Sequence, residues 1–295
     1  MTAIEVQGLR KAYDEHEAVR GIDFEVRRGE VFGLLGPNGA GKTTTVEILE
    51  GYRRRSAGRV SVLGHDPAER DPDLRARMGI VLQSSGIYQY LTVRESVAHW
   101  AGFYPRPRDV DEVISIVGLE AAVDQRANKL SGGQQRRLDL ALALVGDPEL
   151  IFLDEPTTGF DPAARRTAWG TVRSLKELGK TVLLTTHYLD EAQALADRVA
   201  IIKDGRILAE GPPASLGAGA GGSLVCWRGP DGALHTRETD DPTALLHELT
   251  GAALARGERL EDLSVTRPSL EEVYLELTAE ARGGAGDEPS GEAVA

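Results

Sequence analysis

A glycine-rich segment, GPNGAGKT at residues 36–43, constrains the fold of this chain more than any other feature of its sequence. It follows a short apolar run, Val31–Leu35, and leads into a helical stretch, Lys42–Leu49. The pattern G-x-x-x-x-G-K-[S/T] between a strand and a helix is typical of a phosphate-binding loop, because glycines let backbone N–H groups approach an anion. A chance match is the alternative, and the strand–loop–helix setting argues against it. The sequence therefore predicts a nucleotide site in an α/β fold.

The side chains of this loop match the chemistry of a nucleotide with Mg²⁺. Lys42 places a mobile cation on the β- and γ-phosphates, and the hydroxyl of Thr43 is a ligand for the metal ion. The helix that follows directs its positive N-terminus at the phosphates. The nucleotide-binding residues predicted from this loop are Gly36, Pro37, Asn38, Gly39, Ala40, Gly41, Lys42, Thr43 and Thr44.

Two adjacent carboxylates close an apolar run at residues 150–155, LIFLDE. Side chains alternate along a strand, so Asp154 and Glu155 should serve different tasks at its end. Asp154 suits the outer shell of Mg²⁺, and Glu155 suits a general base that polarises an attacking water. The alternative is a solvated strand end, which is common for acidic residues. The phosphate-binding loop earlier in the chain favours the catalytic interpretation, in which Lys42 is a further catalytic residue.

Residues 130–134, LSGGQ, predict a second anion-binding helix end. Ser131 is a good N-cap for a helix with an apolar stripe at Leu138, Leu142 and Val145, and the two glycines after it leave the N-terminal amides uncovered. Two helix ends presented by separate elements cannot easily bind the same γ-phosphate within one chain. Two copies arranged head to tail could do so, each closing the nucleotide site of the other. The alternative is an ordinary capped helix.

Composition and charge exclude several classes of protein. The net charge of −12 argues against broad nucleic-acid binding, so no nucleic-acid partner is expected. Residues 221–295 carry −9 of this charge, which indicates a separate, solvated C-terminal module. The single cysteine, Cys226, rules out an intramolecular disulfide and fits a reducing compartment. No apolar run reaches the ~18 residues that cross a bilayer, and residues 1–20 lack the features of a secretory signal, so we expect a soluble chain.

The order of the three motifs is that of a known family. The chain resembles the nucleotide-binding subunits of ATP-binding-cassette (ABC) transporters from about residue 3 to residue 215. In that family LSGGQ is the signature motif, and it is far more specific than the phosphate-binding loop. The resemblance implies ATP and Mg²⁺ as cofactors. It also implies that Ser131, Gly132, Gly133 and Gln134 contact the nucleotide of a second copy.

Further positions take their expected roles from the resemblance. Tyr13, in RKAY, stands where the family stacks an aromatic ring on adenine, and Gln83, in VLQ, resembles the glutamine that contacts Mg²⁺. Asp161, in TTGFDP, resembles the aspartate that communicates between protomers, although Phe160 before it replaces a more usual leucine. His187, in LLTTHYLDEA, resembles the switch histidine near the γ-phosphate and is expected to be catalytic. Without the resemblance, Tyr13, Gln83 and His187 would pass for ordinary structural residues.

The predicted fold class is α/β, a P-loop ABC ATPase core followed by a small C-terminal α+β domain. The core is expected to contain a mixed sheet with flanking helices, an antiparallel β subdomain and a helical subdomain. Predicted strands are Ile4–Val6, Ile22–Val26, Val31–Leu35, Arg59–Leu63, Gly79–Leu82, Leu150–Leu153, Thr181–Thr185 and Val199–Ile202. Predicted boundaries are 1–216 for the ATPase domain, about 84–145 for its helical subdomain, 217–222 for a linker, 223–281 for the small domain and 282–295 for a disordered tail.

A single cassette without membrane helices resembles subunits that pair with separate membrane proteins. We therefore expect an integral-membrane permease subunit as a separate chain, a second and identical ATP-binding subunit, and a location on the cytoplasmic face of the cell membrane. The segment Arg267–Thr278, RPSLEEVYLELT, resembles the ending of daunorubicin-type drug-resistance exporter ATPases. This implies export of a small, hydrophobic or antibiotic-like compound. Import, or export of a lipid or polysaccharide, is the alternative within the family.

Other classes of ATPase or GTPase fit less well. Soluble ABC-type ATPases of translation usually carry two cassettes, those of DNA repair insert coiled coils or zinc modules, and this chain has neither feature. A GTPase would need the pattern N-K-x-D, which residues 128–131, NKLS, fail at the fourth position. A binding module without turnover is disfavoured by Glu155 together with His187.

Overall fold

The computed structural model describes residues 1–81, 88–219, 223–229, 232–266, 270–271 and 274, and the chain divides into two compact units, Met1–Glu210 and Gly211–Ala295. Among the predicted site residues, Gln83 lies outside the described residues, and the others belong to the first unit. Within the described ranges, no helix is both long enough and apolar enough to cross a bilayer.

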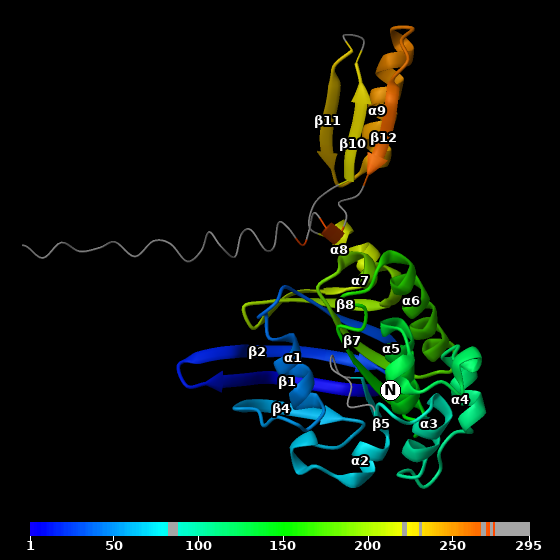
Figure 1. The fold of residues 1–295 in the computed structure, drawn as a ribbon. Coiled ribbons are helices and arrows are strands. Elements are labelled where there is room, and N and C mark those ends of the chain that lie inside the picture. The colour runs from blue at the N-terminus through cyan, green and yellow to red at the C-terminus, as the bar shows by residue number, and fades with distance from the viewer. Residues whose placement is uncertain (82–87, 220–222, 230–231, 267–269, 272–273, 275–295) are drawn as a thin grey trace, which may run out of the picture. The chain divides into compact units, whose positions relative to one another are not determined.

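A six-stranded sheet forms the centre of the first unit, with the strand order β5-β6-β7-β3-β8-β9 (Figure 1). The neighbouring pairs from β5 to β8 are all parallel. β9 follows β8 through a two-residue turn at Asp204 and Gly205, whose φ angles of 48° and 75° suit a tight hairpin. The strands are β3 (Val31–Leu35), β5 (Met78–Val81), β6 (Leu150–Asp154), β7 (Thr181–Thr186), β8 (Arg198–Lys203) and β9 (Arg206–Gly211).

A second, antiparallel sheet has the strand order β2-β1-β4. It contains β1 (Thr2–Tyr13), β2 (His16–Arg27) and β4 (Ala57–Val62), which confirms the predicted antiparallel subdomain. The predicted strands Ile4–Val6 and Ile22–Val26 are the inner parts of β1 and β2. The outer parts continue to pair up to Tyr13 and His16, but their side chains are largely polar and give no clear alternation in the sequence.

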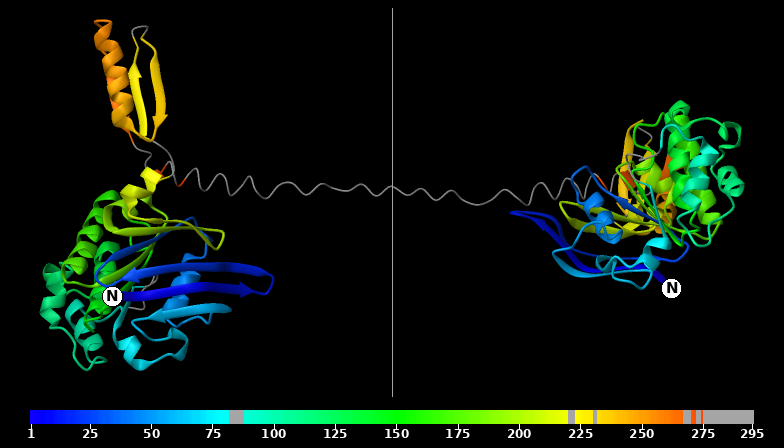
Figure 2. Two further views of the ribbon diagram at one scale, coloured as in Figure 1. Left: turned by 180° about the vertical axis from the view of Figure 1, so that it is seen from behind. Right: turned by 60° about the horizontal axis from the view of Figure 1, so that its bottom comes forward.

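Helices lie on both faces of the six-stranded sheet (Figures 1 and 2). Helix α1 (Lys42–Leu49) has the predicted bounds and contacts both sheets. The helical subdomain contains α3 (Val93–Ala101), α4 (Val110–Ile116) and α5 (Gly132–Leu144). The other helices of the first unit are η1 (Pro67–Glu69), α2 (Pro72–Ala76), η2 (Glu120–Ala122), η3 (Ala127–Lys129), α6 (Pro162–Glu177) and α7 (Leu189–Leu195).

The six-stranded sheet separates two hydrophobic cores. Phe32 and Leu34 of β3 pack on the side of α1 and the antiparallel strands, whereas Val31 packs on the side of α5, α6 and α7. In the same way, Phe152 of β6 belongs to the first core and Ile151 to the second. Strands that are buried on both faces give continuous apolar runs rather than alternation, which is why their positions were predictable from the sequence.

The second unit is a small α+β arrangement. β10 (Ser223–Arg228) pairs in antiparallel fashion with both β11 (Leu234–Thr239) and β12 (Glu261–Thr266), and α9 (Pro242–Ala255) contacts β10. Helix α8 (Pro213–Gly219) covers the first half of the segment predicted as a linker. The tail at 282–295 and most of Arg267–Thr278 lie outside the described residues, and the domain boundaries stay a prediction.

Glu149 connects three parts of the first unit at the start of β6. Its carboxylate accepts a hydrogen bond from Arg77 Nε at 2.6 Å and pairs with Arg28, and these two guanidinium groups lower the pKa of Glu149 from 4.5 to about 2 against the opposing effect of burial. A carboxylate whose pKa is lowered by folding stabilises the fold above its unfolded pKa, and this contribution is lost as the pH falls through the folded pKa.

Glu149→Gln should therefore lower the free energy of unfolding by about 1 kcal/mol at neutral pH, a value kept small because the carboxylate is partly exposed. The difference between variant and wild type should shrink as the pH falls from 4.5 toward about 2. Urea unfolding at several pH values measures it. An undiminished difference at the acid end would contradict the ion-pair explanation.

Candidate nucleotide-binding site

Three loops meet at the carboxyl edge of the six-stranded sheet. β3 pairs in parallel with β7, and β7 pairs in parallel with β6, so the loops that follow these strands leave the same edge side by side. The loop after β3 is the glycine-rich segment, the loop after β6 begins with Glu155, and the loop after β7 begins with His187. The sheet thus brings together the motifs that the sequence places far apart.

Two glycines of the phosphate-binding loop cannot be replaced by larger residues without displacing the backbone. Gly41 precedes α1 with a φ of 103°, and a Cβ there would lie 2.6 Å from the carbonyl oxygen of Ala18. A Cβ on Gly36 would lie 2.2 Å from the carbonyl oxygen of Ile202. The loop can follow its path against these neighbours only because it has no side chains at the two positions.

Lys42 is buried among oxygen acceptors, with 4% of its side chain exposed. Its Nζ donates to the carbonyl oxygens of Gly36 at 2.7 Å and Pro37 at 3.1 Å, and it lies 3.4 Å from Glu155 Oε1. Burial lowers the pKa of Lys42, and the carboxylates of Glu155 and Asp154 oppose that effect. The loop therefore holds a cation at the first residue of α1, beside the backbone amides of the helix N-terminus, where a phosphate would be neutralised.

Asp154 and Thr43 place oxygen atoms together beside Lys42. Thr43 Oγ1 donates to Asp154 Oδ2 at 3.5 Å, and Thr185 Oγ1 donates to Asp154 Oδ1 at 2.5 Å. Burial raises the pKa of Asp154, as does neighbouring Glu155, while the Thr185 hydrogen bond opposes the shift. A hydroxyl and a carboxylate fit Mg²⁺, a hard cation that also keeps water and phosphate ligands. The described residues contain no cluster of three His, Cys, Asp or Glu side chains that could hold a metal ion.

Glu155 lies beside both Lys42 and His187, with 3.4 Å from its Oε1 to Lys42 Nζ and to His187 Nδ1. Its backbone has a left-handed conformation with a φ of 47°. Its N–H donates to both the carbonyl oxygen and Oγ1 of Thr185, at 3.2 and 3.0 Å, and this anchors the turn. Its Oε2 accepts a hydrogen bond from Thr158 Oγ1 at 3.1 Å. Burial raises the pKa of Glu155, but Lys42 and His187 outweigh burial and the net pKa is lowered. The carboxylate is therefore ionised at neutral pH and available as a proton acceptor.

His187 follows β7 directly and faces Glu155. Its Nδ1 lies 3.4 Å from Glu155 Oε1, yet this buried nitrogen makes no hydrogen bond among the described residues. The imidazole ring packs against the ring of Tyr188, with 4.1 Å between centroids. The structure thus brings Lys42, Glu155 and His187 together, two of them expected from the sequence motifs and His187 from the family resemblance, and their catalytic roles stay predictions.

The LSGGQ motif begins α5, with Ser131 at the N-cap as predicted. Gln134 N donates to Ser131 Oγ at 3.3 Å, and Ser131 N donates to Gln134 Oε1 at 2.8 Å, which completes a capping box. Ser131 and Gly132 are exposed, and no atoms lie within 4 Å of the Cβ positions of Gly132 and Gly133. The end of α5 is therefore an open, capped helix terminus.

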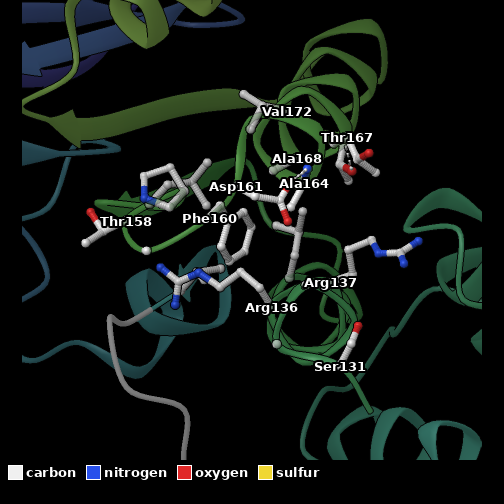
Figure 3. Close-up of a pocket in the computed structure, with 18 residues that line it drawn as sticks. Ser131, Arg136, Arg137, Thr158, Phe160, Asp161, Ala164, Thr167, Ala168 and Val172 are labelled. Carbon is white, nitrogen blue, oxygen red and sulfur yellow. Dashed lines mark hydrogen bonds between the residues drawn. The ribbon is translucent and has the colours of Figure 1, made fainter.

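The open end of α5 lies apart from the phosphate-binding loop of the same chain. A pocket of about 510 Å³ extends from Ser131 along α5 to the start of α6, around Phe160 (Figure 3). Its lining residues include Arg136, Asp161 and Val172 but no residue of 36–44. Between described residues, no hydrogen bond or ion pair links 36–44 with 131–134. A neighbouring pocket of about 330 Å³ is lined by both Gly132 and Glu155 but again by no residue of 36–44, so the end of α5 borders the Glu155 side of the site without lining the phosphate-binding loop.

Two other predicted residues occupy distinct places. Tyr13 ends β1, where Lys11 Nζ lies 4.8 Å and Arg53 Cζ 5.2 Å from the centroid of its ring. Asp161 is the N-cap of α6, and its Oδ1 accepts hydrogen bonds at 2.8 Å from the N–H groups of Ala163 and Ala164. Neither residue is bonded to Lys42, Glu155 or His187 within the described part of the chain.

Three residues that support the site were missed by sequence reasoning. Thr185 bonds to both Asp154 and Glu155, Thr158 bonds to Glu155, and Arg136 Nη2 donates to the carbonyl oxygen of Asp154 at 3.1 Å. Thr185 left a weak signal, because it is a hydroxyl in a buried strand at the point where β7 reaches the carboxyl edge. Arg136 had no such signal, since its partner lies on a different element, and Thr158 is one of several hydroxyl residues in the loop that follows Glu155.

Comparisons with known proteins agree with this geometry. The ABC transporter family profile matches residues 19–158. The daunorubicin resistance ATP-binding protein DrrA3 of Streptomyces coeruleorubidus is 38% identical over 307 residues, covering 95% of this chain and 97% of that protein. This chain belongs to the ABC transporter ATP-binding proteins. The Nod factor export ATP-binding protein I of Paraburkholderia xenovorans is 40% identical, covering 94% of this chain and 97% of that protein.

Solved ABC cassettes share the fold. The cassette cbiO1 of Clostridium perfringens is 30% identical with a TM-score of 0.66, covering 74% of this chain and 91% of that one. A dimeric cassette in a post-hydrolysis state, bound to ADP and Pi, is 26% identical with a TM-score of 0.63, covering 71% and 98%. These findings confirm the predicted family, the α/β cassette fold, and the function of an ATP-binding and ATP-hydrolysing transporter subunit. The roles of single residues stay predictions.

Gly36→Ala tests whether the phosphate-binding loop depends on the close approach of its backbone to the backbone of Ile202. The added methyl group would meet the Ile202 carbonyl oxygen, so the variant should lose about 1–3 kcal/mol of stability and bind ATP at least about tenfold more weakly. Gly170→Ala on α6 is the control, because a Cβ there meets no atom within 4 Å. Urea unfolding and equilibrium ATP binding measure the effects, and wild-type affinity in Gly36→Ala would refute the explanation.

Proposed function

We propose that two copies of this ABC ATPase bind two MgATP molecules head to tail. Each nucleotide lies between the phosphate-binding loop of one copy and the exposed N-terminus of α5 of the other. Binding closes the pair, and hydrolysis lets it reopen. The pair binds separate integral-membrane permease subunits at the cytoplasmic face of the membrane. As the pair closes and reopens, these subunits switch between two access states.

One observation carries the proposal: a single chain contains both halves of an ATP site, but among the described residues its helix end at Ser131 makes no hydrogen bond or ion pair with its own phosphate-binding loop. Lys42 and its neighbours form a cluster of bonded charges at the carboxyl edge of the sheet. Ser131 caps a helix end that is exposed and bonded only within its own first turn. A second copy supplies the anion that this helix end can bind.

The cluster around Glu155 supports hydrolysis within each site. Glu155 is the general base that takes a proton from the attacking water, since the nearby cations keep it ionised. His187 holds that water in line with the γ-phosphate, and Lys42 neutralises charge as the bond to the leaving group breaks. Thr43 and Asp154, together with Gln83, would hold Mg²⁺, which would supply further charge neutralisation when bound. Tyr13, at the end of β1, would stack on adenine.

Glu155→Gln should keep ATP binding but reduce hydrolysis by at least about a hundredfold, because an amide cannot accept the proton. The variant should accumulate as an ATP-bound dimer, detected by size-exclusion chromatography with light scattering. Adding Ser131→Arg to Glu155→Gln should abolish that dimer, because the guanidinium group blocks the helix end, yet leave ATP binding unchanged. Loss of binding in the double variant, or wild-type turnover in Glu155→Gln, would contradict the two-copy site.

We propose export of a small, hydrophobic or antibiotic-like compound as the transport task. The support is the 38% identity to a daunorubicin resistance protein along 97% of its length. A relative named for Nod factor export is about equally similar, so export of a lipid-bearing saccharide is the second candidate. Substrate contacts belong to the membrane subunits, and this chain supplies the ATPase cycle for either compound.

The membrane subunit is proposed to dock on an aromatic cluster of the helical subdomain. Tyr88, His99, Trp100 and Phe103 pack edge to face at the end of α3, with centroid separations of 5.3 to 6.4 Å. Tyr88 and Phe103 nevertheless stay 56% and 68% exposed. A rigid, exposed aromatic surface suits the apolar side of a short amphipathic helix from a permease loop.

Phe103→Asp should reduce co-purification of the membrane subunit by at least about fivefold without changing the ATPase activity of the isolated chain. The carboxylate would have to be desolvated against the apolar side of the partner helix. Leu254→Asp on α9 is the control, because Leu254 is also highly exposed, at 74%, but lies in the second unit. Equal co-purification by both variants would place the docking surface elsewhere.

A further inference from the structure

The ring of Tyr188 contacts both a residue of the nucleotide site and a residue of α6. Its centroid lies 4.1 Å from that of the His187 ring, with 40° between the two planes. The guanidinium carbon of Arg165 lies 4.2 Å from the same Tyr188 centroid. The two rings are therefore in direct contact, and the guanidinium group is within the ~6 Å over which cation–ring contacts are attractive. Tyr188 therefore joins Arg165 to His187 through its ring.

The ring of Tyr188 is the surface against which the imidazole ring of His187 packs. In a functional histidine, one ring nitrogen acts on the substrate, and the other usually fixes the orientation of the ring by a hydrogen bond to a carboxylate or carbonyl group. Here Nδ1 of His187 is buried without such a bond among the described residues, and it lies 3.4 Å from Glu155 Oε1. Because Nδ1 makes no such hydrogen bond among the described residues, the orientation of the imidazole ring depends on the side chains packed around it, and the Tyr188 ring is one of these.

Arg165 ties this surface to the beginnings of two helices. It lies one turn after Asp161, the N-cap of α6, and its Nη1 donates to Asp190 Oδ2 at 3.1 Å in the first turn of α7. The guanidinium group of Arg165 is thus held by α7, whereas the backbone of the same residue belongs to α6. A displacement of the start of α6 would shift the Arg165–Tyr188 contact and, with it, the ring of His187.

We propose that Tyr188 is a positioning residue that sets the orientation of His187, and that Arg165 makes this orientation depend on the position of the Asp161 end of α6. The inference rests on the proposed role of His187 in hydrolysis. It adds a route by which an approaching second copy, met at the start of α6, would align the histidine with the γ-phosphate. Tyr188 acts through His187 and touches no nucleotide.

The backbone of this segment has its own anchor, which lets the ring be tested separately. The N–H of Tyr188 donates to Thr186 Oγ1 at 2.9 Å, so the start of α7 stays attached when the side chain is truncated. Tyr188→Phe preserves the ring and removes only the hydroxyl group. Tyr188→Ala removes both, and comparison of the two variants isolates the ring contact.

The test is steady-state ATP hydrolysis by the full-length chain, with kcat and KM measured separately. Tyr188→Ala should lower kcat about tenfold, as expected for a lost aromatic contact, and change KM for ATP less than about twofold. Tyr188→Phe should keep at least about half of the wild-type kcat, and Arg165→Gln should lower kcat about threefold. Arg173→Gln is the matched control on α6, because Arg173 bonds to the carbonyl oxygen of Ala194 rather than contacting Tyr188.

A double-mutant cycle separates this inference from the proposed function. If Tyr188 acts through His187, then Tyr188→Ala should cause no further loss in a His187→Ala background. Full activity in His187→Ala alone would refute the role of His187 itself. Inactive His187→Ala together with wild-type kcat in Tyr188→Ala would overturn the positioning role, and so would a loss in Tyr188→Phe as large as that in Tyr188→Ala.

Discussion

Parallel pairing of β6, β7 and β3 is the constraint on which the nucleotide site depends. These strands have hydrophobic cores on both faces of the sheet, and the side chains buried in the two cores fix the pairing register. Fixed register places Glu155, His187 and the phosphate-binding loop at one edge of the sheet. A shift of β6 by one residue would exchange the directions of Asp154 and Glu155, because successive side chains point to opposite faces.

The charges gathered at that edge are stable only together. An ammonium group buried without a partner would lower the stability of the fold by about 3–5 kcal/mol. Lys42 avoids this loss because carbonyl acceptors and two carboxylates lie around it. Burial raises the pKa of both neighbouring carboxylates, but the net shifts differ: the pKa of Asp154 is raised, whereas Lys42 and His187 bring the pKa of Glu155 below its usual value. Adjacent carboxylates with opposite shifts are suited to different tasks.

The second surface in the proposed function is the end of α5. Because it makes no hydrogen bond or ion pair with the phosphate-binding loop among the described residues, we propose that a second copy completes the ATP site. Arg136 on α5 reaches the carbonyl oxygen of Asp154, so the helix that would serve the partner is also tied to the strand that carries the carboxylates. On the other side, the Arg165–Tyr188 contact ties the start of α6 to His187. Both surfaces that a second copy would meet are therefore connected to the interior of the site.

Local chemistry was enough to predict the phosphate-binding loop, the carboxylate pair after an apolar strand and the Ser131 cap, because each depends on residues that are neighbours in the chain. The roles assigned to Tyr13 and Gln83 needed the family resemblance, since one aromatic or amide residue has no distinctive pattern. Thr185 and the Tyr188 contact became visible only in the folded chain. The partners of Thr185, and Arg165 as a partner of Tyr188, lie on other elements, and the distances between elements depend on strand pairing and helix packing, which local periodicity does not encode.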